Sequence, residues 1–187
     1  MCIRDSLEKN VNIISNFIQC EFWSNLKQTF DPSKIILRLY LFFDDYETGN
    51  PLGSHAGLNK VGAVYASIAC LPPRYQSKLE NIFTFLLFNT LDRKHLGNHA
   101  VLREAINELE FLEEGGITLN VDGLDYNLHF RFVLLLGDNL GLHTLLGFVE
   151  SFRANFFCRI CLINKSDMGL ILDEDLCTHR NLSLIHI

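Results

Sequence analysis

The sequence lacks the features that mark several large classes of protein. It has no run of about 18 uncharged apolar residues, so we expect no membrane-spanning helix. No signal peptide is visible at its start. It also contains no internal repeat and no low-complexity tract, which argues against repeat arrays and compositionally disordered chains. A folded domain without a membrane partner is therefore expected.

Basic charge is also scarce, because the formal net charge is −6. An acidic chain binds DNA poorly by itself, since affinity for phosphates depends on Lys and Arg. This counts against a stand-alone DNA-binding module. A catalytic core whose carboxylates hold metal ions is still compatible with the charge.

What the chain does contain is enough apolar material for one core. Of its 187 residues 48% are hydrophobic, and 15 are Phe, which fits a single domain. Three of the six cysteines cluster late in the chain, at Cys158, Cys161 and Cys177. This distribution favours a reducing compartment with one metal site over a disulfide framework.

The two ends of the chain are related at the level of their codons. One short DNA word, read on opposite strands, encodes residues 1–6 and 182–187, and it resembles the mosaic-end adapter of sequencing libraries. We therefore predict that both segments are sequencing-adapter scars and exclude them from the fold. The natural protein is then expected to continue past both ends of residues 7–181.

Hydrophobic periodicity and turn residues predict an N-terminal helical lead-in over residues 7–34 and an α/β core over 35–156. A helix begins at Asn98 and ends at Gly115-Gly116, and a hairpin turns at Asp122-Gly123. A last helix is expected over about 140–151, with Val149 facing inward. The predicted strands are 35–43, 61–71, 82–88, 117–121 and 126–136.

This order of elements predicts an RNase H-like mixed sheet with flanking helices, in which the hairpin adds an extra strand. The first and fourth principal strands of that fold lie side by side and parallel. Asp44-Asp45 closes the first strand and Asp138 closes the fourth, so these carboxylates should meet. Facing carboxylates can bind a pair of Mg²⁺ or Mn²⁺ ions. The alternative is that each Asp is only a turn former or a helix N-cap.

Several blocks of the sequence resemble the tnp2-type transposases of the CACTA superfamily. Residues 44–54 are similar to the family's Asp-Gly-x-Asn-Pro-x-Gly-Ser stretch, and Pro72-Pro73 matches its Leu-Pro-Pro. Gly137-Asp138-Asn139 and Phe157–Cys161 resemble the second aspartate and the Cys-x-x-Cys that follows it. Residues 178–181 are similar to a later His-Arg-Arg. The resemblance covers most of residues 31–181.

The resemblance implies a transposase core that cleaves a phosphodiester at the element's end and joins the freed 3′ hydroxyl to target DNA. It makes Asp138 the second catalytic carboxylate and Asp44 or Asp45 the first, with Mg²⁺ or Mn²⁺ as cofactor. The third acid of the family lies beyond this chain, and Glu150 comes too early to replace it. We therefore expect the chain alone to be inactive, its intact parent to bind DNA, and its location to be nuclear by resemblance only. The oligomeric state stays open.

The late cysteines predict a zinc-binding segment over residues 157–181. Cys158 and Cys161 have the spacing of a zinc half-site, and Cys177 and His179 could complete four ligands. The alternative is a pair of reduced cysteines beside a core helix.

Two rival readings keep the fold and the zinc half-site. In one, the chain is a domesticated, non-catalytic binding or scaffold protein. In the other, it is a decayed relic of a transposon. In the scaffold reading both aspartates would be dispensable, whereas a transposase core requires them.

Overall fold

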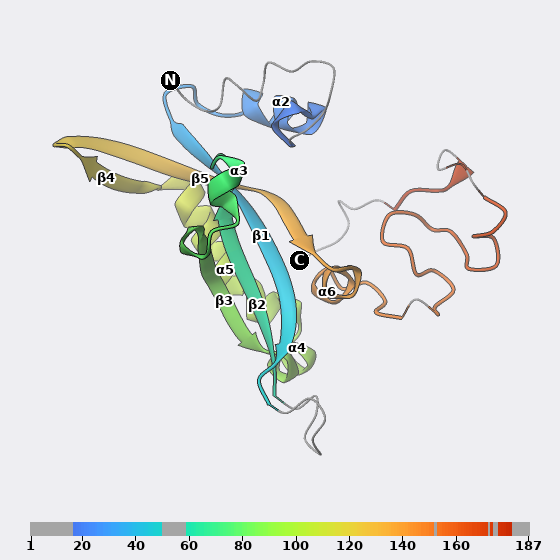
Figure 1. Cartoon of the computed structure of the whole chain (residues 1–187). Helices are drawn as coiled ribbons and strands as arrows, with labels where there is room; N and C mark the ends of the chain where they lie inside the picture. Colours follow the sequence, from blue (N-terminus) through green and yellow to red (C-terminus); the bar gives the residue numbers. More distant parts are fainter. Residues whose placement is uncertain (1–16, 50–58, 152, 172, 174–175, 181–187) are drawn as a thin grey trace. The chain divides into compact units, whose positions relative to one another are not determined.

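The computed structural model of the chain describes residues 17–49, 59–151, 153–171, 173 and 176–180. The predicted adapter segments, 1–6 and 182–187, lie outside the described residues, as does the family-like stretch from Asn50 to Ser54. The predicted α/β class is confirmed, because one five-stranded sheet is combined with several helices (Figure 1).

The elements follow the chain in an order close to the predicted one. In sequence they are η1 (Phe17–Gln19), α2 (Glu21–Gln28), β1 (Ile35–Glu47), β2 (Lys60–Ile68), α3 (Pro73–Gln76), η2 (Leu79–Asn81), β3 (Ile82–Asn89), α4 (Thr90–Leu96), α5 (Asn98–Glu114), β4 (Ile117–Val121), β5 (Leu124–Gly137) and α6 (Asn139–Leu145).

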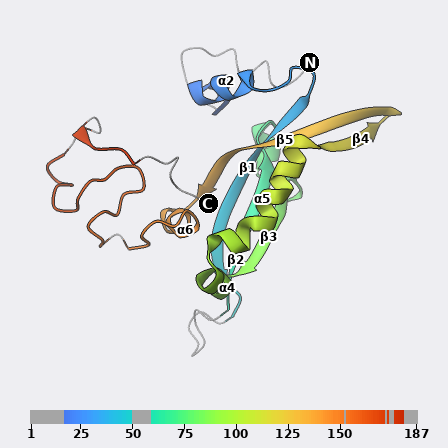
Figure 2. The same ribbon diagram turned by 180° about the vertical axis from the view of Figure 1, so that it is seen from behind.

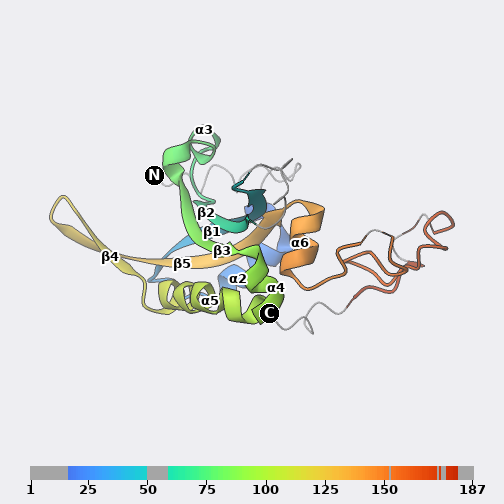
Figure 3. The same ribbon diagram turned by 90° about the horizontal axis from the view of Figure 1, so that it is seen from below.

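The strand order in the sheet is β3-β2-β1-β5-β4. Strand β5 therefore lies beside β1 although three other strands and two longer helices separate them in sequence, and this predicted adjacency is confirmed. Strands β4 and β5 form an antiparallel hairpin in which Val121 pairs with Leu124 (Figure 3). Its two turn residues, Asp122 and Gly123, have φ values of 53° and 82°, as a type I′ turn requires.

Several predicted boundaries are wrong. Strand β2 ends at Ile68 and not at Leu71. Strand β1 does not end at Phe43 but continues through both aspartates to Glu47. Helix α6 ends at Leu145, and Gly147 follows with a φ of 71°, which the right-handed helix does not allow. Val149 consequently lies outside the helix and is exposed rather than inward.

The chain divides into two compact units, and the first comprises Met1–Leu41, Tyr65–Phe85 and Ala105–Leu134. In it, the ring centroids of the buried Trp23 of α2 and of Phe30 are 5.8 Å apart. The Arg38 guanidinium carbon lies 4.8 Å from the centroid of the Trp23 ring. The C-terminal half of α5 lies next to β5 (Figure 2). There the Glu113 carboxylate accepts a hydrogen bond from Arg131, and its carbonyl oxygen contacts His129 Nδ1 at 2.9 Å.

The second unit comprises Phe42–Val64, Leu86–Glu104 and Leu135–Ile187. Its centre is Phe43, which is fully buried and stacks on Phe88 at a centroid distance of 6.0 Å. Gly62 of β2 makes this stack possible, because a Cβ at that position would lie 2.3 Å from the Phe88 ring. A glycine in the middle of a strand thus allows a close approach of the ring to the backbone.

Candidate functional site

The end of β5 lies beside the Phe43 segment of β1 in the second unit, next to the predicted carboxylates, and β1 continues from there to Glu47. A Cβ added at Gly137, the last residue of β5, would lie 3.0 Å from the carbonyl oxygen of Phe43. Asp138 and Asp44 each come one residue after this point of contact. Figure 1 shows β1 and β5 running in the same general direction, with β5 ending at α6 and β1 continuing past it toward α4.

The side chain of Phe43 defines the helix-covered face of this end of the sheet. Its ring carbon Cδ1 lies 3.2 Å from where a Cβ of Gly141 in α6 would be. A Cβ at Gly137 would likewise meet Leu142 of α6, at 3.3 Å. Both positions therefore face α6.

Asp45 belongs to this helix-covered face. Because side chains alternate along a strand, Asp45 leaves β1 on the same side as Phe43. Its Oδ1 accepts a hydrogen bond of 3.3 Å from the hydroxyl of Thr90, a buried residue at the start of α4. Asp45 itself is half-buried. This carboxylate has a structural partner inside the protein.

Asp44 leaves β1 on the side opposite Phe43. The Asp138 carboxylate instead turns toward α6, because its Oδ1 lies 2.8 Å from the Cβ position of Gly141 that the Phe43 ring approaches to 3.2 Å. The backbone of Asp138 is still extended, with φ −69° and ψ 168°. Asp44 and Asp138 are both exposed. Asp44 and Asp45 therefore differ in exposure and partners, and both remain candidates for the first carboxylate.

Asp138 also has a structural role, because it is the N-cap of α6. Its Oδ1 accepts a hydrogen bond of 2.5 Å from the backbone N–H of Gly141. The geometry is that of an ordinary N-cap, so the alternative that Asp138 caps a helix is confirmed. One carboxylate can hold a cap through one oxygen and still offer its other oxygen to a cation.

The far end of α6 is held by side chains from the junction of α4 and α5. The Asn98 amide donates to the carbonyl oxygens of Thr144 at 3.0 Å and Leu145 at 2.7 Å. The buried Arg93 donates to the same Thr144 oxygen at 3.3 Å. Helix α6 is thus capped at both ends, which fixes the point at which Asp138 starts it.

Glu150 does not join the aspartates. Its Oε1 lies 3.7 Å from Nη2 of Arg93, so it compensates a buried guanidinium. The prediction that Glu150 is no substitute for the third acid is consistent with this ion pair.

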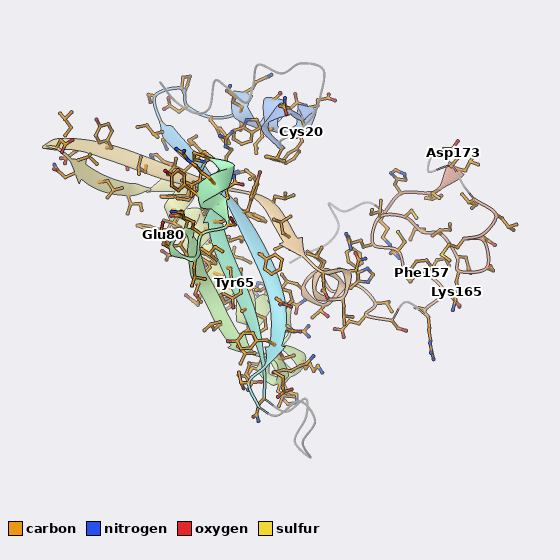
Figure 4. All side chains as sticks on the ribbon, viewed as in Figure 1. Cys20, Tyr65, Glu80, Phe157, Lys165 and Asp173 are labelled. Carbon is orange, nitrogen blue, oxygen red and sulfur yellow. The ribbon has the colours of Figure 1, made fainter. Side chains whose placement is uncertain are left out.

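The predicted zinc half-site forms a tight turn in the second unit, in the segment that Figure 4 marks by Phe157, Lys165 and Asp173. The Cys158 sulfur accepts hydrogen bonds from the backbone N–H groups of Ile160 at 3.4 Å and Cys161 at 3.5 Å. Burial acts to raise the pKa of Cys158, yet these N–H donors hold its pKa below the ordinary thiol value. The turn therefore favours the thiolate that a metal ion needs at this sulfur.

The second half of the predicted site lies across from the first. Cys161 and His179 are partners in an antiparallel β-bridge, flanked by backbone hydrogen bonds from Leu162 to Thr178 and from Arg180 to Ile160, each 2.8 Å. Partners in such a bridge project their side chains to the same side. Among the described residues, however, no three His, Cys, Asp or Glu side chains are arranged as a metal site.

Sequence reasoning missed the residues that hold these groups in place. Thr90 could have been suspected, because a hydroxyl directly after a strand lies near the end of the sheet. Asn98 was recognised only as a potential N-cap, whereas its amide caps a different helix. Arg180 binds the carbonyl oxygens of Cys158 and Phe156, and no local pattern predicts that contact.

Comparison with known proteins returned neither a matching family model nor a matching curated protein. In the part of the chain that the structure describes, no helix is long and apolar enough to cross a membrane.

Proposed function

We propose that this chain is part of the catalytic core of an RNase H-like DNA transposase, with Asp44 and Asp138 as two of its metal-binding carboxylates. The proposal rests on the strand order of the sheet together with the positions of the two aspartates. Three strands in sequence are followed by one that lies on the other side of β1. The exposed Asp44 follows Phe43 within β1, and the exposed Asp138 follows Gly137, which lies against Phe43. The resemblance of residues 44–54 and 137–161 to tnp2-type transposases supports the same reading.

The donor set fits Mg²⁺ or Mn²⁺, because both are hard cations that prefer carboxylate and water oxygens. A bound metal pair would activate the attacking oxygen and stabilise the leaving oxygen of a phosphodiester. Asp44 and Asp138 would hold the ions, and Asp45 would fix the end of β1 through Thr90. The third acid and the DNA-binding surface belong, by resemblance, to other parts of the parent protein.

Calorimetric titration with Mg²⁺ tests this assignment. Asn is as good an N-cap as Asp, so Asp138→Asn keeps the start of α6 while removing the charge. We expect Asp138→Asn and Asp44→Asn each to weaken Mg²⁺ binding at least tenfold, and the matched control Asp45→Asn to change it less than threefold. Equal affinity in all four proteins would refute the proposed site.

One observation favours the rival scaffold function, namely the N-cap that Asp138 provides to α6. A scaffold requires the cap but not the charge. Wild-type protein that binds no Mg²⁺, together with an unfolding midpoint unchanged in Asp138→Asn, would therefore select the scaffold.

The chain alone should not cleave DNA, because it supplies two carboxylates where the family uses three. Supercoiled plasmid incubated with the protein and Mn²⁺ should stay intact over hours. Nicking that Asp138→Ala abolishes would contradict this expectation and show that a complete site is present.

We also propose that zinc binds at Cys158 and Cys161, with Cys177 and His179 as the remaining ligands. The support is the hydrogen-bonded turn at Cys158 and the bridge between Cys161 and His179. Protein refolded with zinc should retain about one ion per chain, and a chelator should lower its thermal midpoint. Cys158→Ser should lose the ion and Cys20→Ser should keep it; no retained zinc in the wild type would end this proposal.

A further inference from the structure

The outer strand β4 has an open edge, and we propose that it pairs with the β4 of a second copy of this chain, antiparallel and centred on Leu119. Among the strands that the structure describes, the order β3-β2-β1-β5-β4 gives β4 a single neighbour, β5. Exposed strand edges are commonly protected by Lys, Pro or a bulge. The sequence of β4, Ile-Thr-Leu-Asn-Val, contains no charged residue, no Pro and no Gly.

The hairpin has two unlike faces. Its apolar face consists of three directly opposed pairs, and its other face carries Thr118 opposite Asn127 and Asn120 opposite Asp125. Leu119 and Val121 remain 48% and 50% exposed, because they have a cross-strand neighbour on one side only. The apolar pairs are Ile117–Leu128, Leu119–Tyr126 and Val121–Leu124.

The turn decides which backbone groups face the open edge. In a two-residue hairpin the pair next to the turn, Val121 and Leu124, exchanges both of its backbone hydrogen bonds. Hydrogen-bonded pairs alternate along the ladder, so Ile117 and Leu119 also direct their N–H and C=O groups toward β5. Thr118 and Asn120 must then direct theirs outward, toward a strand beyond β4.

The outward-facing residues of β4 lie symmetrically about Leu119, so the same strand of a second copy fits this edge. Rotation about a two-fold axis at Leu119 brings Thr118 opposite Asn120 of the other copy as a hydrogen-bonded pair. Ile117 comes opposite Val121, and Leu119 meets its own counterpart across a non-hydrogen-bonded position. Apolar residues meet apolar ones and outward-facing backbone groups meet each other, so the one strand supplies both halves of an isologous contact.

Charge does not oppose the contact locally. The antiparallel arrangement sends the two Asp122 turns to opposite ends of the paired strands, and β4 itself is uncharged. Each chain nevertheless carries a net charge of −6, so two copies repel each other at long range. Salt screens this repulsion. Association should therefore strengthen as the salt concentration rises.

Sedimentation of the whole chain tests the pairing through variants at one exposed position. Leu119→Lys sets two like charges directly opposite each other, which disfavours a cross-strand pair. Leu79→Lys is the control, because Leu79 is an exposed leucine in η2, away from the hairpin. We expect a dimer at about 100 µM protein, a dissociation constant at least tenfold higher in Leu119→Lys, and no change in Leu79→Lys.

A positive test of the register uses Leu119→Cys. The two-fold axis places the new thiols opposite each other at a non-hydrogen-bonded position, where Cα atoms are about 4.5 Å apart. Mild oxidation should yield a covalent dimer that Leu79→Cys does not form. A chain that stays monomeric at this concentration with no cross-link at position 119, or a dimer that Leu119→Lys leaves intact, would overturn the proposal.

Discussion

Phe43 determines the face of β1 from which each neighbouring carboxylate leaves. Its ring is fully buried against Phe88 and reaches Gly141, so the side chain cannot turn toward the other face. Asp45 must then follow it to the helix-covered side, and Asp44 must leave on the opposite side. The side on which each of these two carboxylates lies therefore depends on the burial of one aromatic ring.

Replacing that ring should be costly. Phe43→Ala removes a fully buried aromatic side chain and should lower the free energy of unfolding by about 3–5 kcal/mol. The neighbouring Phe42 is 43% exposed, so Phe42→Ala should cost below about 1 kcal/mol. Urea denaturation of both variants checks the difference, and equal losses would mean that Phe43 is not the centre of this core.

His129 should make stability depend on pH. Burial lowers its pKa, and the charge of Lys34 lowers it further while Asp31 acts in the opposite direction. The unfolded chain, with a histidine pKa of about 6.5, then binds more protons than the folded chain in the window below that value. Stability should therefore rise with pH from about 5 to 7.

The variant His129→Gln removes this titration while keeping an N–H donor for the Glu113 carbonyl oxygen. Thermal midpoints measured across the same pH range should rise less steeply in His129→Gln than in the wild type. An identical slope in the two proteins would show that other groups cause the dependence.

At the scale of elements, α6 connects the candidate site to the rest of the second unit. Asp138 caps its start, and Asn98 binds two carbonyl oxygens at its end. These contacts join elements far apart in sequence, so they hold α6 in a single position relative to the start of α5. A helix of seven residues needs such tertiary support, because short helices are marginal on their own.

Asn98→Ala should loosen α6. Loss of two hydrogen bonds should cost about 1–3 kcal/mol and speed amide exchange in residues 142–145. Asn107→Ala, at an exposed position of the same α5, is the matched control and should change stability by less than about 0.5 kcal/mol. Unaltered exchange in α6 of Asn98→Ala would contradict its role as a clamp.

Sequence patterns predicted the presence of helices and strands better than the residues at which they begin and end. The start of α5 at Asn98 was confirmed, although the Asn98 amide caps α6 and not α5. The hairpin at Asp122-Gly123 was also confirmed, because type I′ turn residues act locally. The length of β1 was not predictable from its apolar run, since Asp44 and Asp45 continue the strand through pairing with neighbours. The end of α6 was missed because an apolar period extends past Gly147, where the backbone has already left the helix.

At the scale of the whole molecule, the order of elements was enough to predict that β5 would lie beside β1. Three strands, a helix and a further strand allow few ways to bring the last strand to the first. The same order could not separate Asp44 from Asp45, because that choice depends on which face Phe43 buries.

The most direct test of the central claim is to locate Mn²⁺ on the folded chain by paramagnetic broadening of its amide signals. With Mn²⁺ at a small fraction of one equivalent per chain, broadening should centre on Asp44 in β1 and on Asp138 after the end of β5. It should vanish there in Asp138→Asn and persist in Asp45→Asn. Broadening centred instead on the acidic hairpin at Asp122 and Asp125, or spread evenly over the exposed carboxylates, would contradict a metal site shared by β1 and β5.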